Sequence, residues 1–327
     1  MNILYGIQGT GNGHISRGRY IYDLLKKYAV SVDVLVSGNN YSLKHNIPVR
    51  YTNQGFTFSV YNGKIDYLKT LVNLDLFTSF SQQKDIPFQK YDLIITDFEP
   101  VTAWAGVRYK IPSIHISHQA SFINNNVPRP LTKSILGEYV MKYFCPSNDY
   151  IGLHYQKYGD DISEPIISER IKKSRVELKD HITIYLPWFE DDYLFAFFQQ
   201  LNDFKFQIFS KNINKIKNVN NITFFPVDEF TFPESIRTCS GVICNAGFQT
   251  SSEVIYLGKR LLVVPIEGQY EQLCNVAALK KIGINSISRL DNNSLHIIRH
   301  WMNSQPIQIK FQNNLEDILA SKLNNLK

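Results

Sequence analysis

Short runs of apolar residues alternate with stretches of helical periodicity along nearly the whole chain. In the first half, the predicted strands are 2–7, 31–37, 91–96 and 113–117. The second half repeats this pattern, with predicted strands at 181–186, 204–209, 222–225, 241–244 and 261–265. Helical patterns follow these runs, the first of them over 15–28. Apolar strands separated by helices are typical of a parallel sheet that is covered on both faces.

A polar, charged stretch at 155–180 shows no strand alternation and divides the chain. The 327 residues are more than one core usually organises, since domains commonly hold about 150 residues. We therefore expect an α/β protein with two doubly wound domains, at 1–163 and 164–305. A C-terminal helix is expected within 306–327. Ligands of such sheets bind at the carboxyl ends of the strands.

Composition narrows the class of protein. Hydrophobic residues make up 44% and charged residues 20% of the chain, which rules out wholesale disorder. The four cysteines lack C-x-x-C spacing, so we expect neither a disulfide framework nor a zinc site. We also expect no other metal and no cofactor. No signal segment opens the sequence, and no apolar run reaches the roughly 18 residues of a membrane span. We expect a cytoplasmic protein.

The charge balance is mildly basic, with 35 Lys and Arg against 29 Asp and Glu, a net charge of +6. No run of five basic residues occurs, so a nucleic-acid partner is not expected. The excess is compatible with a phosphate-bearing ligand or an anionic membrane surface. Two segments, 64–86 and 129–144, mix apolar positions with Lys and Arg. Such a pattern fits an ordinary surface helix or a helix in peripheral contact with the inner face of a membrane.

A glycine-rich turn, Gly9-Thr-Gly11-Asn-Gly13-His14, follows the first predicted strand and opens the first helix. A dinucleotide-binding fingerprint needs a glycine where His14 stands, which argues against an NAD site. The helix dipole disfavours the protonated form of a histidine at this position, so His14 is a candidate base. A histidine that only caps its own helix is the alternative.

Two carboxylates, Asp97 and Glu99, stand where the predicted strand 91–96 ends. Either one can orient His14 and stabilise its imidazolium, because we expect this strand beside the first one. Asp97 can instead cap the helix that follows, a position that Asp favours. His118 stands at the end of the next strand and can line the same cleft.

A second strand–turn–helix pattern occupies 241–253. Gly247 permits a ligand to approach the backbone closely, and Thr250 places a hydroxyl in the first helical turn. Unpaired backbone N–H groups at this helix start would receive a pyrophosphate. Glu253 lies one turn deeper and suits the vicinal hydroxyls of a ribose. A second polar cluster, 267–275, opens the next helix.

With these motifs the sequence resembles the nucleotide-sugar glycosyltransferases of the GT-B fold, such as the UDP-glucuronosyltransferases and the lipid II synthase MurG. It looks closest to bacterial and archaeal relatives that share the G-x-G-x-G-H opening and a D-F-E-P element, here 97–100. The spacing from Asn245 to Glu253 matches the H-x-G-x-x-[ST]-x-x-E motif of the family, with Asn in place of His. The resemblance covers roughly 1–290. It implies two Rossmann-like domains that face each other across a cleft.

The resemblance also implies roles for single residues. Glu271 and Gln272 match the pair that holds the donor sugar, and 225–230 matches the segment that packs on the nucleobase. His14 falls where the family carries its acceptor-side histidine, and we take His14 and Asp97 as the catalytic pair. The donor-binding residues are then Asn245, Gly247, Phe248, Thr250, Glu253, Glu271, Gln272, Phe225 and Val227. On the acceptor side we expect Gly11, Gly13, Glu99 and His118.

These features predict an inverting, metal-independent glycosyltransferase. It would move a sugar from a nucleotide-sugar donor, a UDP-sugar, to a hydroxyl of a saccharide or lipid-linked acceptor, which fits cell-envelope polysaccharide synthesis. His14 would take the proton of that hydroxyl, and the helix start would stabilise the leaving group. Two alternatives stay open. A nucleotide-sugar 2-epimerase would use cleft carboxylates among Glu99, Glu267 and Glu271, and a nucleotide-sugar-binding protein would keep the fold without the chemistry.

Overall fold

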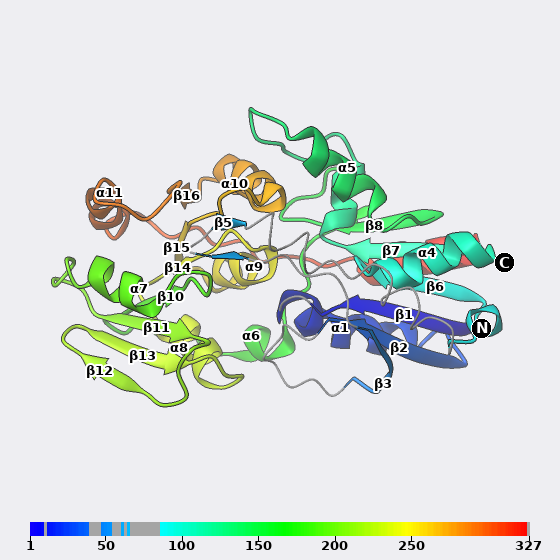
Figure 1. The fold of residues 1–327 in the computed structure, drawn as a ribbon, viewed down its shortest axis with the longest axis horizontal. Coiled ribbons are helices and arrows are strands. Elements are labelled where there is room, and N and C mark those ends of the chain that lie inside the picture. The colour runs from blue at the N-terminus through cyan, green and yellow to red at the C-terminus, as the bar shows by residue number, and fades with distance from the viewer. Residues whose placement is uncertain (10–11, 39–46, 54–59, 62–63, 66–85, 326–327) are drawn as a thin grey trace.

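The computed structural model describes residues 1–9, 12–38, 47–53, 60–61, 64–65 and 86–325. Gly11 and nearly all of the stretch 64–86 therefore lie outside the described residues. Within the described residues, the chain forms two seven-stranded sheets with helices on their faces (Figure 1). A third sheet is a short antiparallel ribbon of β4 (Val60–Tyr61) and β5 (Lys64–Ile65). The α/β class and the GT-B arrangement of two Rossmann-like units predicted from the sequence are confirmed.

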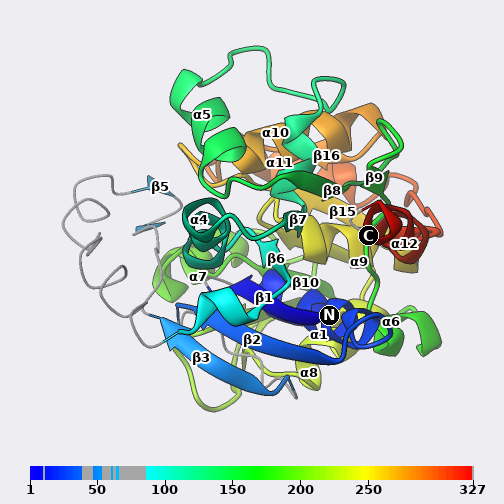
Figure 2. The same ribbon diagram turned by 90° about the vertical axis from the view of Figure 1, so that its right-hand side faces the viewer.

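All strand pairs in the first sheet are parallel. From one edge to the other, the strands are β3 (Val49–Asn53), β2 (Ser31–Ser37), β1 (Asn2–Gln8), β6 (Leu93–Asp97), β7 (Ser113–Ser117), β8 (Asp149–Leu153) and β9 (Ile162–Ser163). Figure 2 shows this order from the bottom of the picture to the top. The central strand β1 is buried from Ile3 to Gln8, because helices cover both of its faces.

The second sheet repeats this design, and only its edge strand β12 runs antiparallel. Its strands in order are β12 (Lys217–Val219), β13 (Ile222–Pro226), β11 (Phe206–Ser210), β10 (Ile182–Tyr185), β14 (Gly241–Cys244), β15 (Arg260–Val263) and β16 (Asn285–Ser286). The predicted apolar runs form the centre of this sheet. β14 is buried along its whole length.

Helices connect successive parallel strands, as the alternating pattern predicts. The main ones are α1 (Asn12–Leu25), α4 (Pro100–Tyr109), α5 (Ile135–Tyr143), α7 (Asp191–Phe198), α8 (Thr231–Thr238), α9 (Phe248–Leu257), α10 (Tyr270–Lys281) and α11 (Ser294–Trp301). The first helix begins and ends three residues before the predicted 15–28, because it starts within the glycine-rich turn itself. Among the described helices, none has the length and apolar composition needed to cross a bilayer.

The chain passes between the two sheets twice. It first crosses through a segment that holds the short helix α6 (Glu169–Lys173), inside the charged stretch 155–180 that was predicted to divide the chain. After α11 it returns, and the terminal helix α12 (Leu315–Asn324) lies beside the first sheet (Figures 1 and 2). There Lys322 Nζ lies 2.7 Å from a carboxylate oxygen of Asp149 and 2.7 Å from one of Asp161. The terminal helix is thus fastened to the first sheet, although it follows the second in sequence.

Candidate active site

The glycine-rich turn and the end of β6 meet at the carboxyl edge of the first sheet. Strands β1 and β6 are parallel neighbours in which Ile7 is paired with Asp97, so both strands end at the same level. His14, in the first turn of α1, places its Nδ1 2.9 Å from Asp97 Oδ1. The Asp97 side chain is fully buried, whereas the His14 side chain is 13% exposed. The structure therefore brings the two predicted catalytic side chains together, with only the histidine accessible.

Arg17 is a third member of this cluster, and the sequence analysis missed it. Its Nε donates to Asp97 Oδ2 at 2.8 Å, and its Nη2 donates to Asp97 Oδ1 at 2.5 Å. The same Nη2 lies 2.6 Å from His14 Nδ1. A signal was available, because residues three apart on a helix share a face and His14 and Arg17 have this spacing.

The buried ion pair controls the charge of Asp97. Burial alone would raise the pKa of Asp97, but the Arg17 guanidinium and His14 outweigh burial and lower the pKa to about 2. Burial alone would lower the pKa of Arg17, but the Asp97 carboxylate outweighs burial and raises that pKa. Asp97 is therefore an anion at every physiological pH, and its charge is balanced by Arg17 before any substrate arrives.

The proton on His14 has two possible positions in this cluster. If Arg17 Nη2 donates to His14 Nδ1, the ring carries its proton on Nε2 and offers a donor to the cleft. If Nδ1–H instead donates to Asp97, Nε2 has a free lone pair and can accept a proton. Base catalysis requires the second arrangement.

Glu99 caps helix α4 and does not face the cleft, contrary to the acceptor-side role expected for it. Its carboxylate accepts hydrogen bonds from the backbone N–H of Val101 at 2.8 Å and of Thr102 at 2.7 Å, and from Ser37 Oγ at 2.6 Å. The side chain is fully buried, and burial raises its pKa despite these bonds. Phe98, with a left-handed φ of 54°, turns the chain sharply between Asp97 and Glu99. The cap considered for Asp97 is thus supplied by Glu99, which leaves Asp97 free to bind Arg17 and His14.

His118 is not an open acceptor-side residue but lies in the interior between the two sheets. Its ring is 1% exposed, with Nδ1 2.8 Å from the carbonyl oxygen of Leu153 and Nε2 2.6 Å from Asn275 Oδ1. The ring stacks on Phe248, with centroids 4.0 Å apart and planes 3° apart. Burial lowers the pKa of His118, and the Glu271 carboxylate and the two hydrogen-bond acceptors work against that effect.

Gly247 is the N-cap of helix α9, and the helix carries much of the predicted donor motif. A Cβ added to Gly247 would meet no atom within 4 Å, so the space in front of this helix start is open. Thr250 lies in the first turn, and Glu253 one turn deeper accepts a hydrogen bond from Gln249 Nε2 at 3.0 Å. Burial raises the pKa of Glu253, and hydrogen bonds from Gln249 and Ser168 partly offset the rise. A Cβ at Gly13 would lie 3.5 Å from the Cβ of Gln249, so the N-terminal turn stands directly against this helix.

Several other predicted donor-binding residues make hydrogen bonds within the protein. Asn245 Nδ2 donates to the carbonyl of Val264 at 2.8 Å, and its buried Oδ1 has no hydrogen-bond partner among the residues that the structure describes. Gln272 Oε1 accepts the backbone N–H of Ile266 at 2.9 Å and so fastens the turn after β15. The neighbouring Glu271 accepts a hydrogen bond from Gln119 Nε2 of the first sheet at 3.0 Å.

The predicted nucleobase segment, 225–230, begins at the end of β13, at the carboxyl edge of the second sheet. Phe225 stacks on Phe209, with ring centroids 5.3 Å apart, and Val227 is half-buried in the turn that follows. Among the residues that the structure describes, no group of three or more His, Cys, Asp or Glu is placed to hold a metal ion.

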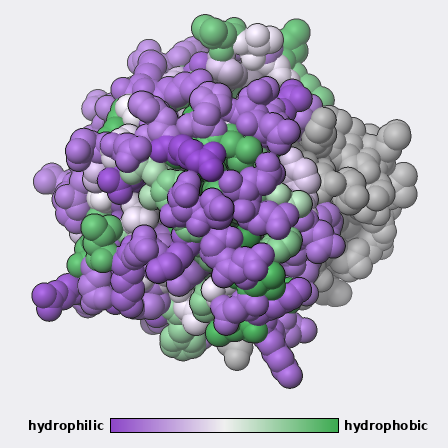
Figure 3. All heavy atoms as spheres, turned by 90° about the vertical axis from the view of Figure 1, so that its left-hand side faces the viewer, coloured by the Kyte–Doolittle hydropathy of each residue, from purple (hydrophilic) through white to green (hydrophobic). Residues whose placement is uncertain are grey.

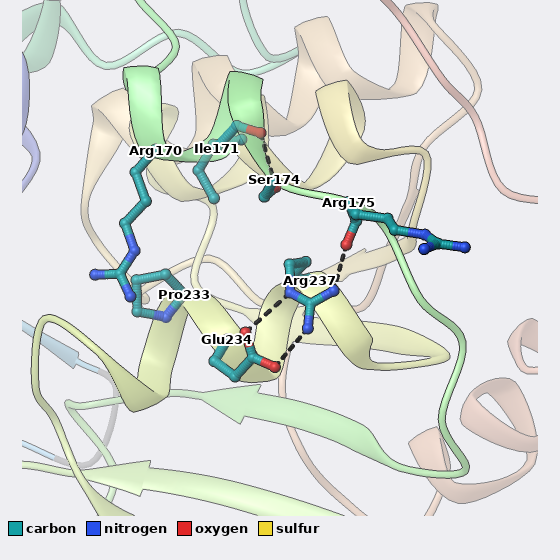
Figure 4. A pocket seen from close by; sticks show the side chains of 7 residues that line it. All are labelled: Arg170, Ile171, Ser174, Arg175, Pro233, Glu234 and Arg237. Carbon is teal, nitrogen blue, oxygen red and sulfur yellow. Dashed lines mark hydrogen bonds and ion pairs between the residues drawn. The ribbon is translucent and has the colours of Figure 1, made fainter.

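A cavity of about 280 Å³ lies between α6 and α8 (Figure 4). Three arginines line it, but Arg237 binds Glu234 through Nε at 2.9 Å and Nη2 at 2.6 Å, and Arg170 donates to the carbonyl of Glu229. Arg175 directs its side chain away from the other lining residues in Figure 4. Since two guanidinium groups are already bound and the third points away, this cavity does not form an anion site. It contains none of the predicted site residues.

The model of one protein family, glycosyl transferase family 1, matches residues 1–306. The chain belongs to this family. The transferase also shares its fold with solved structures of low sequence identity. MurG from Acinetobacter baumannii is 13% identical with a TM-score of 0.56, and the match covers 99% of each chain. UGT89C1 from Arabidopsis thaliana, solved with UDP, is 13% identical with a TM-score of 0.57, covering 99% of this chain and 93% of that one.

SnogD from Streptomyces nogalater, a glycosyltransferase, is 15% identical with a TM-score of 0.50, and the match covers 100% of this chain and 99% of that one. No curated protein sequence matches the transferase. The likeness to these three structures concerns the fold. The resemblance to GT-B glycosyltransferases inferred from the sequence motifs is confirmed.

Replacing Asp97 with Asn is expected to destabilise the protein by about 3–5 kcal/mol at pH 7, because Arg17 would remain as a buried cation without its counter-charge. In the wild type, the stabilisation from Asp97 is present above its ordinary pKa of 3.8 and is lost as the pH falls through its folded-state pKa near 2. The variant should lack this acid dependence. Urea unfolding between pH 7 and pH 2 measures both effects. Asp23→Asn, which breaks an exposed pair with Arg19, is the control and should cost under about 1 kcal/mol. Equal losses in the two variants would contradict the assignment.

Proposed function

We propose that this transferase moves a sugar from a UDP-sugar donor to a hydroxyl acceptor with inversion at the anomeric carbon. The observation that carries the proposal is the position of His14. It lies next to a buried carboxylate, is accessible, and stands in a turn that packs against the start of α9. The proposed proton acceptor and the proposed phosphate-binding helix start would then lie on opposite sides of one junction.

On the donor side, we assign the diphosphate to the first turn of α9. The unpaired N–H groups and the dipole of this helix favour an anion, and the open space in front of Gly247 admits one. Glu253 would accept the ribose hydroxyls, and Glu271 would contact the transferred sugar in place of Gln119. The same helix start stabilises the charge that develops on the leaving diphosphate, so the proposed mechanism requires no divalent cation.

On the acceptor side, His14 acts as the base. The acceptor oxygen forms the new bond to the anomeric carbon on the face opposite the diphosphate, and the bond to the diphosphate oxygen breaks. The hydroxyl proton passes to His14 Nε2, while Nδ1–H donates to Asp97 and the resulting imidazolium is held beside that carboxylate. The 2-epimerase alternative loses support, because Glu99, one of the three carboxylates it would use, is buried in the cap of α4.

We propose in addition that α5 and the loop before it contact an anionic membrane that carries a lipid-linked acceptor. Among the described residues, five exposed large apolar side chains gather here: Leu131, Ile135, Leu136, Tyr139 and Tyr143. Figure 3 shows a mostly hydrophilic face, with hydrophobic atoms at its upper edge, where Figure 1 places α5.

The opposite side of α5 is occupied by the protein. Gly137 lies against the ring of Tyr270, and Glu138 accepts a hydrogen bond from the Tyr270 hydroxyl at 2.5 Å. Two exposed lysines, Lys133 and Lys142, flank the apolar side. An exposed apolar face with basic flanks complements an anionic lipid surface.

Glu253→Ala is expected to weaken UDP binding by about 1.5–3 kcal/mol, because the ribose loses a charged hydrogen-bond acceptor. Isothermal titration calorimetry with UDP measures the loss. The exposed carboxylate of Glu190 provides the control, since Glu190→Ala removes the same group at the N-cap of α7 rather than on α9. Unchanged UDP affinity in the Glu253 variant would sink the ribose assignment.

His14→Ala is expected to lower kcat about 10²–10⁴-fold, the usual contribution of positioned proton transfer, with UDP affinity unchanged. Steady-state assays with a UDP-sugar are run in EDTA, in which the wild type should keep its activity. If His14 only binds the acceptor, kcat falls by at most about tenfold and the acceptor KM rises instead. His300→Ala, at an exposed histidine, is the matched control.

The double variant Leu131→Gln/Ile135→Gln is expected to reduce binding to vesicles of phosphatidylcholine with phosphatidylglycerol at least about fivefold, because it removes two exposed apolar contacts. Sedimentation with vesicles measures the bound fraction, and vesicles of phosphatidylcholine alone should bind little of any variant. Leu178→Gln, at an exposed leucine elsewhere, should bind like the wild type. If the wild-type protein stays in the supernatant with anionic vesicles, the proposed membrane contact is wrong. Concentration-dependent self-association of the protein would instead assign the apolar face of α5 to a second copy of the chain.

A further inference from the structure

The two residues that follow β7, His118 and Gln119, both reach across to the second sheet. Gln119 donates from Nε2 to Glu271 Oε2, near the start of α10. His118 contacts both α9 and α10 through a single ring. These contacts join the end of a strand in the first sheet to both helices of the proposed donor site.

Three contacts fix the His118 ring. On its own side, Nδ1 lies 2.8 Å from the carbonyl oxygen of Leu153, at the end of β8. Toward the second sheet, Nε2 lies 2.6 Å from Asn275 Oδ1, and the ring face lies 4.0 Å from that of Phe248. Phe248 is the first residue of α9 and follows Gly247 directly. The histidine therefore touches the helix start to which we assign the diphosphate.

Asn275 extends the contact to the turn before α9. Its Nδ2 donates to the carbonyl of Ala246 at 2.9 Å, and this bond fixes the orientation of the amide, so that Oδ1 faces His118. Asn275 is fully buried. His118, Asn275 and the backbone of Ala246 thus form a continuous chain of hydrogen bonds that ends beside Gly247.

We propose that His118 is a positioning residue that holds the starts of α9 and α10 in their donor-binding arrangement against the first sheet. The link to donor binding rests on the proposed function, whereas the coupling between the sheets does not. A neutral imidazole carries one N–H, which it donates either to Asn275 Oδ1 or to the carbonyl of Leu153. Without the imidazole, that buried oxygen would lose its donor, a costly state that favours separation of the two sheets here.

His118→Phe keeps a ring on Phe248 and removes the two ring nitrogens that contact Leu153 and Asn275, and His118→Gln keeps a donor for Asn275. His115→Phe is the matched control, because His115 is equally buried, three residues earlier in β7, and stacks on Phe98 rather than on the second sheet. Hydrogen exchange is measured at the amides of 246–250 and 271–276 without any ligand, and UDP affinity is measured by calorimetry. We expect His118→Phe to speed exchange at both sets of amides and to weaken UDP binding about tenfold. His118→Gln should recover most of both losses, and His115→Phe should change neither.

If a folded His118→Phe protein exchanges the amides of both helix starts at the wild-type rate, the proposal is wrong. It is also wrong if His115→Phe changes these exchange rates as much as His118→Phe does. If the wild type binds no UDP, the proposed function fails, and the exchange data still decide whether His118 couples the sheets. If His118→Phe does not fold, Phe248→Leu replaces it, since it removes only the stacked ring. Faster exchange confined to 246–250 in that variant supports the proposal, and unchanged exchange there refutes it.

Discussion

The parallel arrangement of the strands determines where every functional side chain of this protein lies. In a parallel sheet all strands end at one edge, so the turns after β1, β6 and β7 stand side by side. These turns carry His14, Asp97 and His118. The turns after β14 and β15 likewise place the starts of α9 and α10 together. Because Gly13 lies against Gln249, the two edges face each other and their helix starts share one junction.

Within this junction, the Arg17–Asp97 pair sets the electrostatic conditions. The buried Asp97 carboxylate accepts two hydrogen bonds from the Arg17 guanidinium and lies 2.9 Å from His14 Nδ1, so one anion contacts both side chains. The pair also fixes Asp97 in place through two parallel hydrogen bonds. The cluster therefore holds a rigid carboxylate, with its charge already balanced by Arg17, beside the histidine.

Much of the fold was predictable from the sequence, because apolar runs and helical periodicity depend on local burial. The meeting of His14 and Asp97 was also predictable, since it follows from adjacent parallel strands. Arg17 was missed because its three-residue spacing from His14 indicates a shared helix face, whereas its burial against Asp97 depends on how that face packs on the sheet. Glu99 was misassigned because the bend at Phe98, with its positive φ, moves the cap two residues beyond Asp97. The stacking of His118 on Phe248 could not be predicted, because it joins residues 130 positions apart that only the packed sheets bring together.

The return of α12 to the first sheet has a mechanical consequence. Two segments of the chain connect the halves of the molecule, one through α6 and one that leads to α12. The second is anchored by the ion pairs of Lys27 with Glu316 and of Lys322 with Asp149. A single tether would allow one half to swivel freely about the other. Two connections at separate points resist twisting of one half against the other. They resist bending about the line that joins them less strongly. The two connections therefore restrict how far one half of the molecule can turn against the other.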